Sequence, residues 1–358
     1  MRWARPFTSS LLICLLALRA PAQDAGEVRF RTLSIDDGLS QSTVRAILRD
    51  HRGFMWFATQ DGLDRYDGYA FMIFRHNDRD SLSLADNLVT CLLEDSRGTL
   101  WVGTYNGGVD CYDGRRGGFR HFPGRQTGSG PVSVTCLAED RSGRVWVGTW
   151  GAGLMAFDPA NRSWRYLRHD TTDPSSLIHD QVKAVAVGRD GRLWVATWGG
   201  LDICDPAFGR FVHLSHGTSA ASLSDNRVAS LVVDKQGIVW AGTFEHGLNR
   251  IDPRDNSVVR VVSTMPAPPW PQDRMLGPIA QDGQGVLWIA TRGAGILRFD
   301  PRSGIALPLR HDDRDRTSLS ANAVTSVYID SSGGSWVGTD GGGVNHFDSH
   351  RFKFGHLR

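Results

Sequence analysis

Seven tryptophans recur along this chain at nearly constant intervals. Successive members of the series are 45, 45, 48, 46, 48 and 48 residues apart: Trp56, Trp101, Trp146, Trp194, Trp240, Trp288 and Trp336. A period of this length, kept over most of a 358-residue chain, is typical of a propeller or a solenoid, in which each repeat is one supersecondary unit. The residues around each tryptophan decide between the two.

A turn signal precedes each repeated tryptophan. Gly stands three residues before it in all seven repeats, and Asp stands six residues before it in six of them: Asp50, Asp95, Asp140, Asp234, Asp282 and Asp330. The fourth repeat has Gly188 in the Asp position. In an Asp-x-x-Gly turn the carboxylate can accept hydrogen bonds from the turn amides, and glycine supplies the positive φ. The pattern predicts a hairpin between two strands.

The residues after each tryptophan complete the unit. The second is always Gly or Ala and the third is always Thr, as in Gly103-Thr104, and a small residue in a strand marks the close approach of another sheet. A third and a fourth short apolar run follow, and no ten-residue stretch has helical periodicity. The sequence therefore predicts an all-β fold, a seven-bladed β-propeller of four-stranded antiparallel blades, with each repeated tryptophan buried in a blade core.

The first 22 residues predict a secretory signal peptide. Arg2 and Arg5 precede an apolar run that is too short to span a membrane, and Ala20-Pro21-Ala22 offers a small-residue cleavage site. An uncleaved anchor is the alternative, but Arg19 interrupts the segment where an anchor would continue. Residues 23–358 contain no second hydrophobic span and are assigned to the propeller sensor domain. We expect the mature chain in the periplasm.

Both ends of the repeat region carry an extra strand pattern, at residues 28–33 and 352–357. A closed ring needs only one of them. If the first completes the last blade, the second is the start of a further module, so we interpret the chain as truncated before further modules.

The net charge of the chain argues against nucleic acid as a partner. Without residues 1–22 the formal charge of +2 loses three arginines and no acid, which leaves −1. A near-neutral chain argues against nucleic acid, because phosphate binding needs concentrated Lys and Arg.

Cys91, Cys111, Cys136 and Cys204 match no disulfide framework and are expected to be buried free thiols.

The segment Leu93-Glu-Asp-Ser-Arg-Gly-Thr-Leu-Trp-Val-Gly-Thr-Tyr-Asn-Gly-Gly-Val-Asp-Cys-Tyr-Asp113 resembles the two-component regulator propeller repeat. Gly188 departs from the pattern, and the first and fourth units shorten the Gly-rich turn by one residue. The resemblance implies an extracytoplasmic ligand-sensing module of a receptor with a histidine kinase or diguanylate cyclase output, which is absent here. The sequence has no Ser-His-Asp order, paired-Cys metal motif, phosphate-binding Gly loop or kinase signature, so we expect a sensor or binding module that is not an enzyme and has no cofactor. Many relatives sense oligosaccharides, but the repeats encode only the scaffold.

The repeats differ most at the fourth position after the tryptophan, which is Gln60 in the first unit. The residues there in the other six are the predicted ligand-binding set: Tyr105, Trp150, Trp198, Phe244, Arg292 and Asp340. This position lies on the face opposite the Asp-x-x-Gly turns, and variable residues on a fixed scaffold suit recognition. Sugar rings stack on aromatic side chains, so a small molecule or an oligosaccharide is the expected ligand. The alternative is that these aromatics only cap the blades or pack against a neighbouring module.

Two other functions stay open. A secreted lyase or hydrolase would need convergent reactive groups, for which Glu245 and His246 are the only adjacent candidates, and a protein-binding scaffold is compatible with the same repeats. His76, His169, His216 and His311 share one slot in the long connections and are expected to order those loops, with no metal site. Trp270 breaks the pattern of the sixth connection. A homodimer is left open as a partner.

Overall fold

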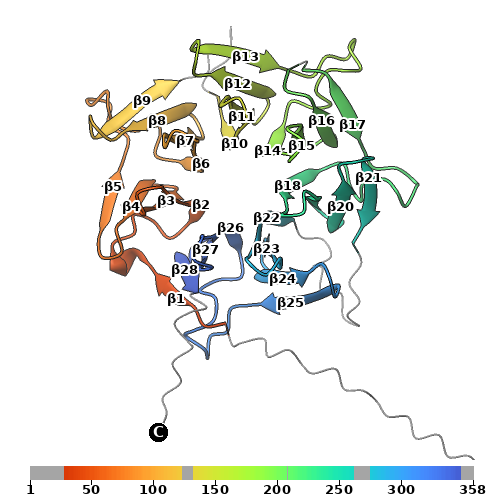
Figure 1. Ribbon diagram of the computed structural model, residues 1–358. Helices are drawn as coiled ribbons and strands as arrows, with labels where there is room; N and C mark the ends of the chain where they lie inside the picture. The colour runs from red at the N-terminus through yellow and green to blue at the C-terminus, as the bar shows by residue number, and fades with distance from the viewer. Residues whose placement is uncertain (1–27, 123–131, 208, 262–274, 348–358) are drawn as a thin grey trace, which may run out of the picture.

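A computed structural model describes residues 28–122, 132–207, 209–261 and 275–347. Seven four-stranded antiparallel sheets stand around a central channel as the blades of a propeller (Figure 1). Across these residues there is no α-helix, only one 3-10 turn at Ile35–Asp37. The fold class predicted from the tryptophan series is confirmed.

The first four blades each take four consecutive strands, ordered from the channel outward. Blade 1 is β2 (Val44–Arg49), β3 (Met55–Thr59), β4 (Gly62–Tyr66) and β5 (Phe71–Phe74). Blade 2 is β6 (Val89–Glu94), β7 (Leu100–Thr104), β8 (Val109–Asp113) and β9 (Gly118–Phe122). Blade 3 is β10 (Val134–Glu139), β11 (Val145–Thr149), β12 (Leu154–Asp158) and β13 (Ser163–Leu167). Blade 4 is β14 (Val182–Val187), β15 (Leu193–Thr197), β16 (Leu201–Cys204) and β17 (Phe211–Leu214).

The last three blades continue the ring and close it. Blade 5 is β18 (Val228–Val233), β19 (Val239–Thr243), β20 (Leu248–Asp252) and β21 (Ser257–Arg260). Blade 6 is β22 (Leu276–Gln281), β23 (Leu287–Thr291), β24 (Ile296–Asp300) and β25 (Ile305–Leu309). Blade 7 is β26 (Val324–Ile329), β27 (Ser335–Thr339) and β28 (Val344–Phe347), with β1 (Arg31–Leu33) as its outer strand. The N-terminal strand thus completes the last blade, while the strand expected at residues 352–357 lies outside the described residues.

Each repeated tryptophan is the centre of a blade interface. All seven are at most 8% exposed, as predicted. In six blades the indole N–H donates to the Asp six residues earlier, as from Trp146 to Asp140 at 2.8 Å, while the other carboxylate oxygen accepts turn amides. Where Gly188 replaces the Asp, the indole N–H of Trp194 is buried without a partner among the described residues. One carboxylate therefore ties the turn to the core of its blade.

The long connections between blades are ordered by the histidine slot. In all four cases the imidazole Nδ1 bonds a leucine carbonyl, for example His76 to Leu84 at 2.6 Å, and the histidine backbone N–H donates to an Asn or Asp side chain. These leucines are at most 1% exposed, so they anchor the connections in the core. The loop-ordering role expected for these histidines is confirmed.

The cysteines in the described residues are free thiols. Cys111 and Cys204 are buried, whereas Cys91 and Cys136 are partly buried at the interface between neighbouring blades. Burial raises the pKa of Cys136 to about 11. Such thiols stay protonated at neutral pH and serve as packing groups.

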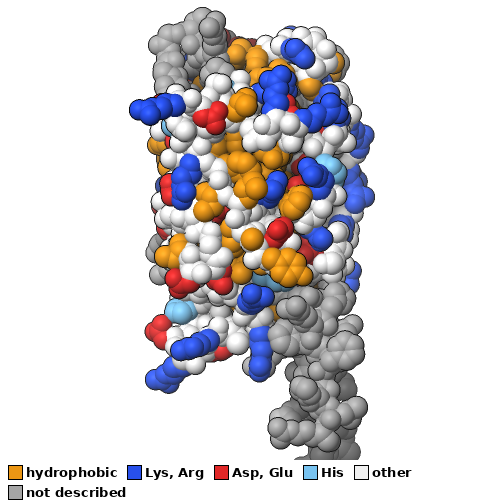
Figure 2. Space-filling model, turned by 90° about the vertical axis from the view of Figure 1, so that its left-hand side faces the viewer, with side chains coloured by type: hydrophobic (Ala, Val, Ile, Leu, Met, Phe, Trp, Pro, Cys, Tyr) orange, Lys and Arg blue, Asp and Glu red, His pale blue; other side chains and the backbone are white. Residues whose placement is uncertain are grey.

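The outer wall of the ring is formed by the fourth strands. Strand β5 leaves Met72 and Ile73 exposed, and Figure 2, which faces this side, shows apolar side chains gathered between charged ones. None of the described segments is a helix with the length and apolarity needed to cross a lipid bilayer.

Candidate functional site

All seven innermost strands carry a register shift just after their first residue, where they pair with the second strand. In blade 4 the shift lies between Val182 and Ala184, so Lys183 is left out of the ladder. A β-bulge of this kind re-aims a side chain. The skipped residues of all seven blades, two of them in blade 6, line one cavity of about 490 Å³ at the channel: Arg45, Thr90, Thr135, Lys183, Ala229, Gly277, Pro278 and Thr325.

The turn between the second and third strands rises beside this cavity. Its conformation is fixed by the repeated threonine, whose hydroxyl donates to a glycine carbonyl three or four residues later in every blade, as from Thr149 to Gly153 at 2.7 Å. In blades 2 to 7 the next residue, at the predicted variable position, donates its backbone N–H to the carbonyl of the residue before the innermost strand, as from Trp150 to Ser133 at 2.9 Å. The variable side chains therefore start from equivalent points around the channel.

Three of the predicted aromatic residues form a continuous row. The ring centroids of Trp150 and Trp198 are 5.0 Å apart and those of Trp198 and Phe244 are 6.1 Å apart, both edge to face. Trp150 is 39% exposed, and the other two are half-buried. We call Trp150, Trp198 and Phe244 the aromatic row. It spans blades 3, 4 and 5 and leaves ring surface open to solvent.

The six predicted residues divide into two groups. Tyr105, Trp150 and Arg292 line the 490 Å³ cavity, and Tyr105 is 47% exposed. Trp198 and Phe244 continue the aromatic row outside its lining. Asp340 is exposed and accepts a hydrogen bond from the Thr43 hydroxyl at 2.9 Å, which links blade 7 to blade 1. The structure thus brings three of the six to the cavity itself, whereas Trp198, Phe244 and Asp340 are not part of its lining.

The cavity also contains cations that the sequence reasoning missed. Arg45 and Lys183 are bulge residues of β2 and β14, and the Lys183 ammonium lies 5.0 Å from the ring centre of Trp150. Burial, together with the positive charges of Arg292 and Arg45, lowers the pKa of Lys183. Their common position directly after the first valine of the innermost strand is the signal that could have identified them.

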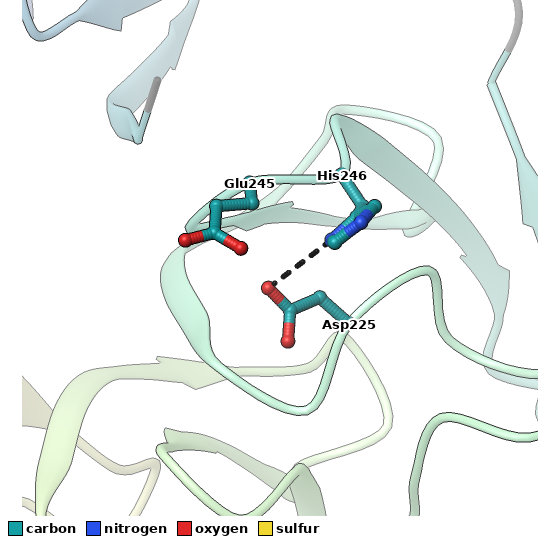
Figure 3. A group of neighbouring side chains, drawn as sticks. All are labelled: Asp225, Glu245 and His246. Carbon is teal, nitrogen blue, oxygen red and sulfur yellow. Dashed lines mark hydrogen bonds and ion pairs between the residues drawn. The ribbon is translucent and has the colours of Figure 1, made fainter. Parts of the chain in front are cut away.

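Asp225, Glu245 and His246 converge at the turn of blade 5 (Figure 3), with candidate ligand atoms within 4.8 Å of one another. The His246 Nδ1 lies 3.5 Å from Asp225 Oδ2. The Arg227 guanidinium lies 2.6 Å from Glu245 and 3.4 Å from Asp225, so it already neutralises both acids. Burial would raise the pKa of Asp225, but the Arg227 backbone amide and guanidinium hold it below its usual value. The group is thus an ion-paired turn that reinforces Phe244, over which Arg227 stacks at 4.8 Å.

The family model described as "Two component regulator propeller" matches this chain at residues 38–61, 83–106, 128–151, 176–199 and 222–245. Each match contains the Asp-x-x-Gly position, the repeated tryptophan and the variable position after it. A curated protein, Histidine kinase P4 of Formosa agariphila, is 42% identical over 77 residues, which are 22% of this chain and 6% of the kinase.

Solved structures share the propeller. The extracellular domain of BT3049 of B. thetaiotaomicron, described as a hybrid two component system, superposes with a TM-score of 0.76 at 24% identity over 90% of this chain and 42% of that chain. That of BT4673, described as a one component system, gives 0.71 at 22% over 89% and 39%. Virginiamycin B lyase from Staphylococcus aureus gives 0.66 at 13% over 90% and 98%.

These likenesses show the fold, which extracellular domains of signalling systems and a lyase share. The chain spans less than half of the two extracellular domains that it matches. The five matches and the seven blades together show that this chain is a propeller that carries two-component regulator propeller repeats.

Proposed function

We propose that this chain is the extracytoplasmic ligand-sensing propeller of a bacterial signalling receptor, with a two-component or cyclic-di-GMP output, and that it is not itself an enzyme. Its ligand, a small molecule or an oligosaccharide, binds at the channel mouth, on the cavity and the rim that Tyr105, Trp150, Trp198, Phe244, Arg292 and Asp340 surround. The propeller repeats support the sensor role, since the similar solved chains include the extracellular domains of a hybrid two component system and of a one component system.

The observation that carries this proposal is the aromatic row beside an open cavity. A row that only capped the blades would gain most by burying its rings, yet Trp150 is 39% exposed and the cavity next to it is lined by Tyr105, 47% exposed. Flat, exposed and pre-positioned rings with polar groups nearby are what a sugar ring or another flat ligand requires.

The enzyme alternative depends on Asp225, Glu245 and His246. A general base must be free to accept a proton, but both carboxylates contact Arg227 and the His246 side chain is 60% exposed. We therefore expect no turnover of sugars or lactones. Saturable turnover by the purified chain that disappears in His246→Ala would favour the lyase or hydrolase function over the sensor.

The test of the proposed site is calorimetric titration with a panel of neutral and acidic oligosaccharides. Each aromatic contact is worth roughly 0.5–1.5 kcal/mol beyond the buried area. We expect Trp198→Ala to weaken binding modestly and Trp150→Ala with Trp198→Ala to weaken it much more, because the double change removes both sides of the 5.0 Å contact.

Tyr69→Ala is the matched control, since Tyr69 is 95% exposed on the outer side of blade 1. It should bind like the parent, and thermal melts should show all variants folded. Equal affinity of the double variant and the parent would mean that the aromatic row is only a cap. Loss of folding in the double variant would place these rings in the blade cores, contrary to their exposure.

A further inference from the structure

Three cations face the channel cavity without a compensating acid. Arg45 and Lys183 come from bulges on opposite parts of the ring, in blades 1 and 4, and Arg292 comes from the turn of blade 6. No Asp or Glu occurs among the described residues that line the cavity. The excess is local, because the whole chain carries a formal charge of only +2.

Three acids of the turns and connections in blades 5 and 7 already contact other partners. Asp225 and Glu245 pair with Arg227, and Asp340 accepts the hydroxyl of Thr43. Within the described residues, no hydrogen bond or ion pair joins the side chain of Arg45, Lys183 or Arg292 to a carboxylate. Gathering like charges at a partly buried site destabilises a fold, which a purely structural channel would avoid.

Among the three cations, Lys183 contributes most to the electrostatic destabilisation of the fold. It is the most enclosed of the three cations, and both its burial and the other two charges favour its neutral form. Its ammonium contacts the face of Trp150 at 5.0 Å, which holds it beside the aromatic row. The arrangement places a positive group next to an exposed ring at the same cavity.

On this geometry, and resting on the ligand-sensing function proposed above, we propose that the channel mouth selects an anionic ligand that carries a carboxylate on a ring. The carboxylate lies among Arg45, Lys183 and Arg292, and the ring lies against Trp150 and Tyr105. The bulges of blades 1 and 4 and the turn of blade 6 supply the charge, and the turns of blades 2 and 3 supply the stacking surface, so one ligand would contact both the innermost strands and the turns. A uronic acid unit at the end of an oligosaccharide has this chemistry.

The first test needs no ligand and uses tryptophan fluorescence at low ionic strength. Trp150 is exposed while the seven core tryptophans are at most 8% exposed, so the difference between the parent and Trp150→Phe isolates the signal at the mouth. Iodide should quench this signal more than caesium, because a cationic site concentrates anions. Equal quenching by the two ions would contradict the local charge, whether or not any sugar binds.

The second test compares oligogalacturonic acid with its methyl ester, which keeps the rings and removes the charge. Charge-assisted hydrogen bonds are roughly twice as strong as neutral ones, so we expect the acid to bind at least about tenfold more tightly than the ester. Lys183→Met and Arg292→Met should each remove most of that preference. Arg314→Met, which removes a charge from an exposed connection outside the cavity, should keep it.

The outcomes separate this inference from the proposed function. Equal binding of acid and ester that is lost in Trp150→Ala would keep the sensor site and overturn its anion selectivity. No binding by either form, or by any member of the neutral and acidic panel, would overturn both. Lys183→Met should melt at the same or a higher temperature than the parent, because it removes an enclosed charge. A marked loss of stability would show instead that Lys183 holds the ring together.

Discussion

At the level of single residues, one position on the third strand fixes the connection that precedes the blade. Some blades use Asp at this position and others use Asn. Five blades place an acceptor there that takes a backbone N–H of the preceding connection: Asp64, Asp110, Asp202, Asn249 and Asn345. The Asp blades 2 and 4 add a histidine, as in Asp110 with His121 at 2.7 Å. The Asn blades 5 and 7 add a serine, whose Oγ accepts from the Asn amide.

Blade 1 has the Asp of one arrangement and the Ser of the other, but it lacks the histidine. Asp64 has a serine, Ser40, in the connection but Ile73 where the other Asp blades have histidine. Its Oδ1 is buried without a partner among the described residues, and burial raises the pKa of Asp64 from 3.8 to about 6. Because the folded-state pKa lies above the unfolded value, ionised Asp64 lowers stability above pH 6, and this penalty fades as pH falls toward 4.

We therefore predict that Asp64→Asn stabilises the propeller at pH 8 by about 1–3 kcal/mol, the cost of a buried unsatisfied polar group. The new amide can donate to the Ser40 hydroxyl, as Asn249 does to Ser224 at 2.9 Å. Thermal melts at pH 8 and pH 4 should show the gain shrinking at the lower pH. Asp110→Asn, which breaks the contact with His121, should give no such gain, and an equal gain in both variants would refute the assignment.

Gly188 replaces the repeated Asp in blade 4, and a carboxylate at this position is expected to stabilise the fold. Restoring the carboxylate should satisfy the buried indole N–H of Trp194, but a Cβ at Gly188 would lie 2.5 Å from Asp190 Oδ1. We therefore expect Gly188→Asp combined with Asp190→Ser, the arrangement that blade 3 has at Asp140 and Ser142, to raise stability by about 1 kcal/mol.

Asp190→Ser alone is the control for that variant, because it removes the contact with Arg192 without adding a partner for the indole. Denaturant unfolding of the two variants and the parent gives the comparison. A double variant no more stable than the single one would show that the unpaired indole costs nothing measurable.

At the level of the strands, side chains that oppose each other on the first and second strands of a blade are matched in size. Where the residue two positions after the tryptophan is Gly, the innermost strand opposes it with Cys or Ser, as Gly103 with Cys91 and Gly338 with Ser326. Where it is Ala, the opposing residue in blades 1 and 4 is Ala. The sulfur of Cys91 therefore fills the space of the missing methyl group, which explains a thiol in a position with no redox partner.

A double-mutant cycle tests this fit. A Cβ at Gly103 would lie 2.4 Å from Cys91 Sγ, so Gly103→Ala should destabilise the fold by about 1–3 kcal/mol. In the background of Cys91→Ala the same change should cost much less, since Ala46 and Ala58 form such a pair in blade 1. Chemical unfolding of all four chains measures the coupling. Additive effects would show that the two positions do not share this space.

At the scale of the whole molecule, the repeated residues predicted the ring because each blade reuses the same local signals. The Asp-x-x-Gly turn, the buried tryptophan and the small residue before Thr are all readable from one unit. The six variable positions could also be placed at equivalent points of the ring, because one slot in a repeat fixes one place in each blade. Their equivalence comes directly from the period.

What the sequence did not predict depends on register and on contacts between blades. Lys183 and Arg45 reach the cavity because each innermost strand bulges there, and a simple alternation of inward and outward residues misses such an extra residue. Asp225 joins Glu245 only through the fold of blade 5, across 20 residues. Likewise the edge-to-face contact of Trp150 with Trp198 joins two separate blades.

We propose that the ligand is recognised at the channel mouth, on the face of the second-to-third strand turns. Hydrogen exchange of the backbone amides, with and without the tightest-binding oligosaccharide of the panel, tests it most directly. We predict added protection in the turns after Thr104, Thr149, Thr197 and Thr291, and none in the Asp-x-x-Gly turns on the opposite face. Protection confined to the Asp-x-x-Gly turns or to the outer strands would show that the ligand binds elsewhere on the propeller and not at the channel mouth.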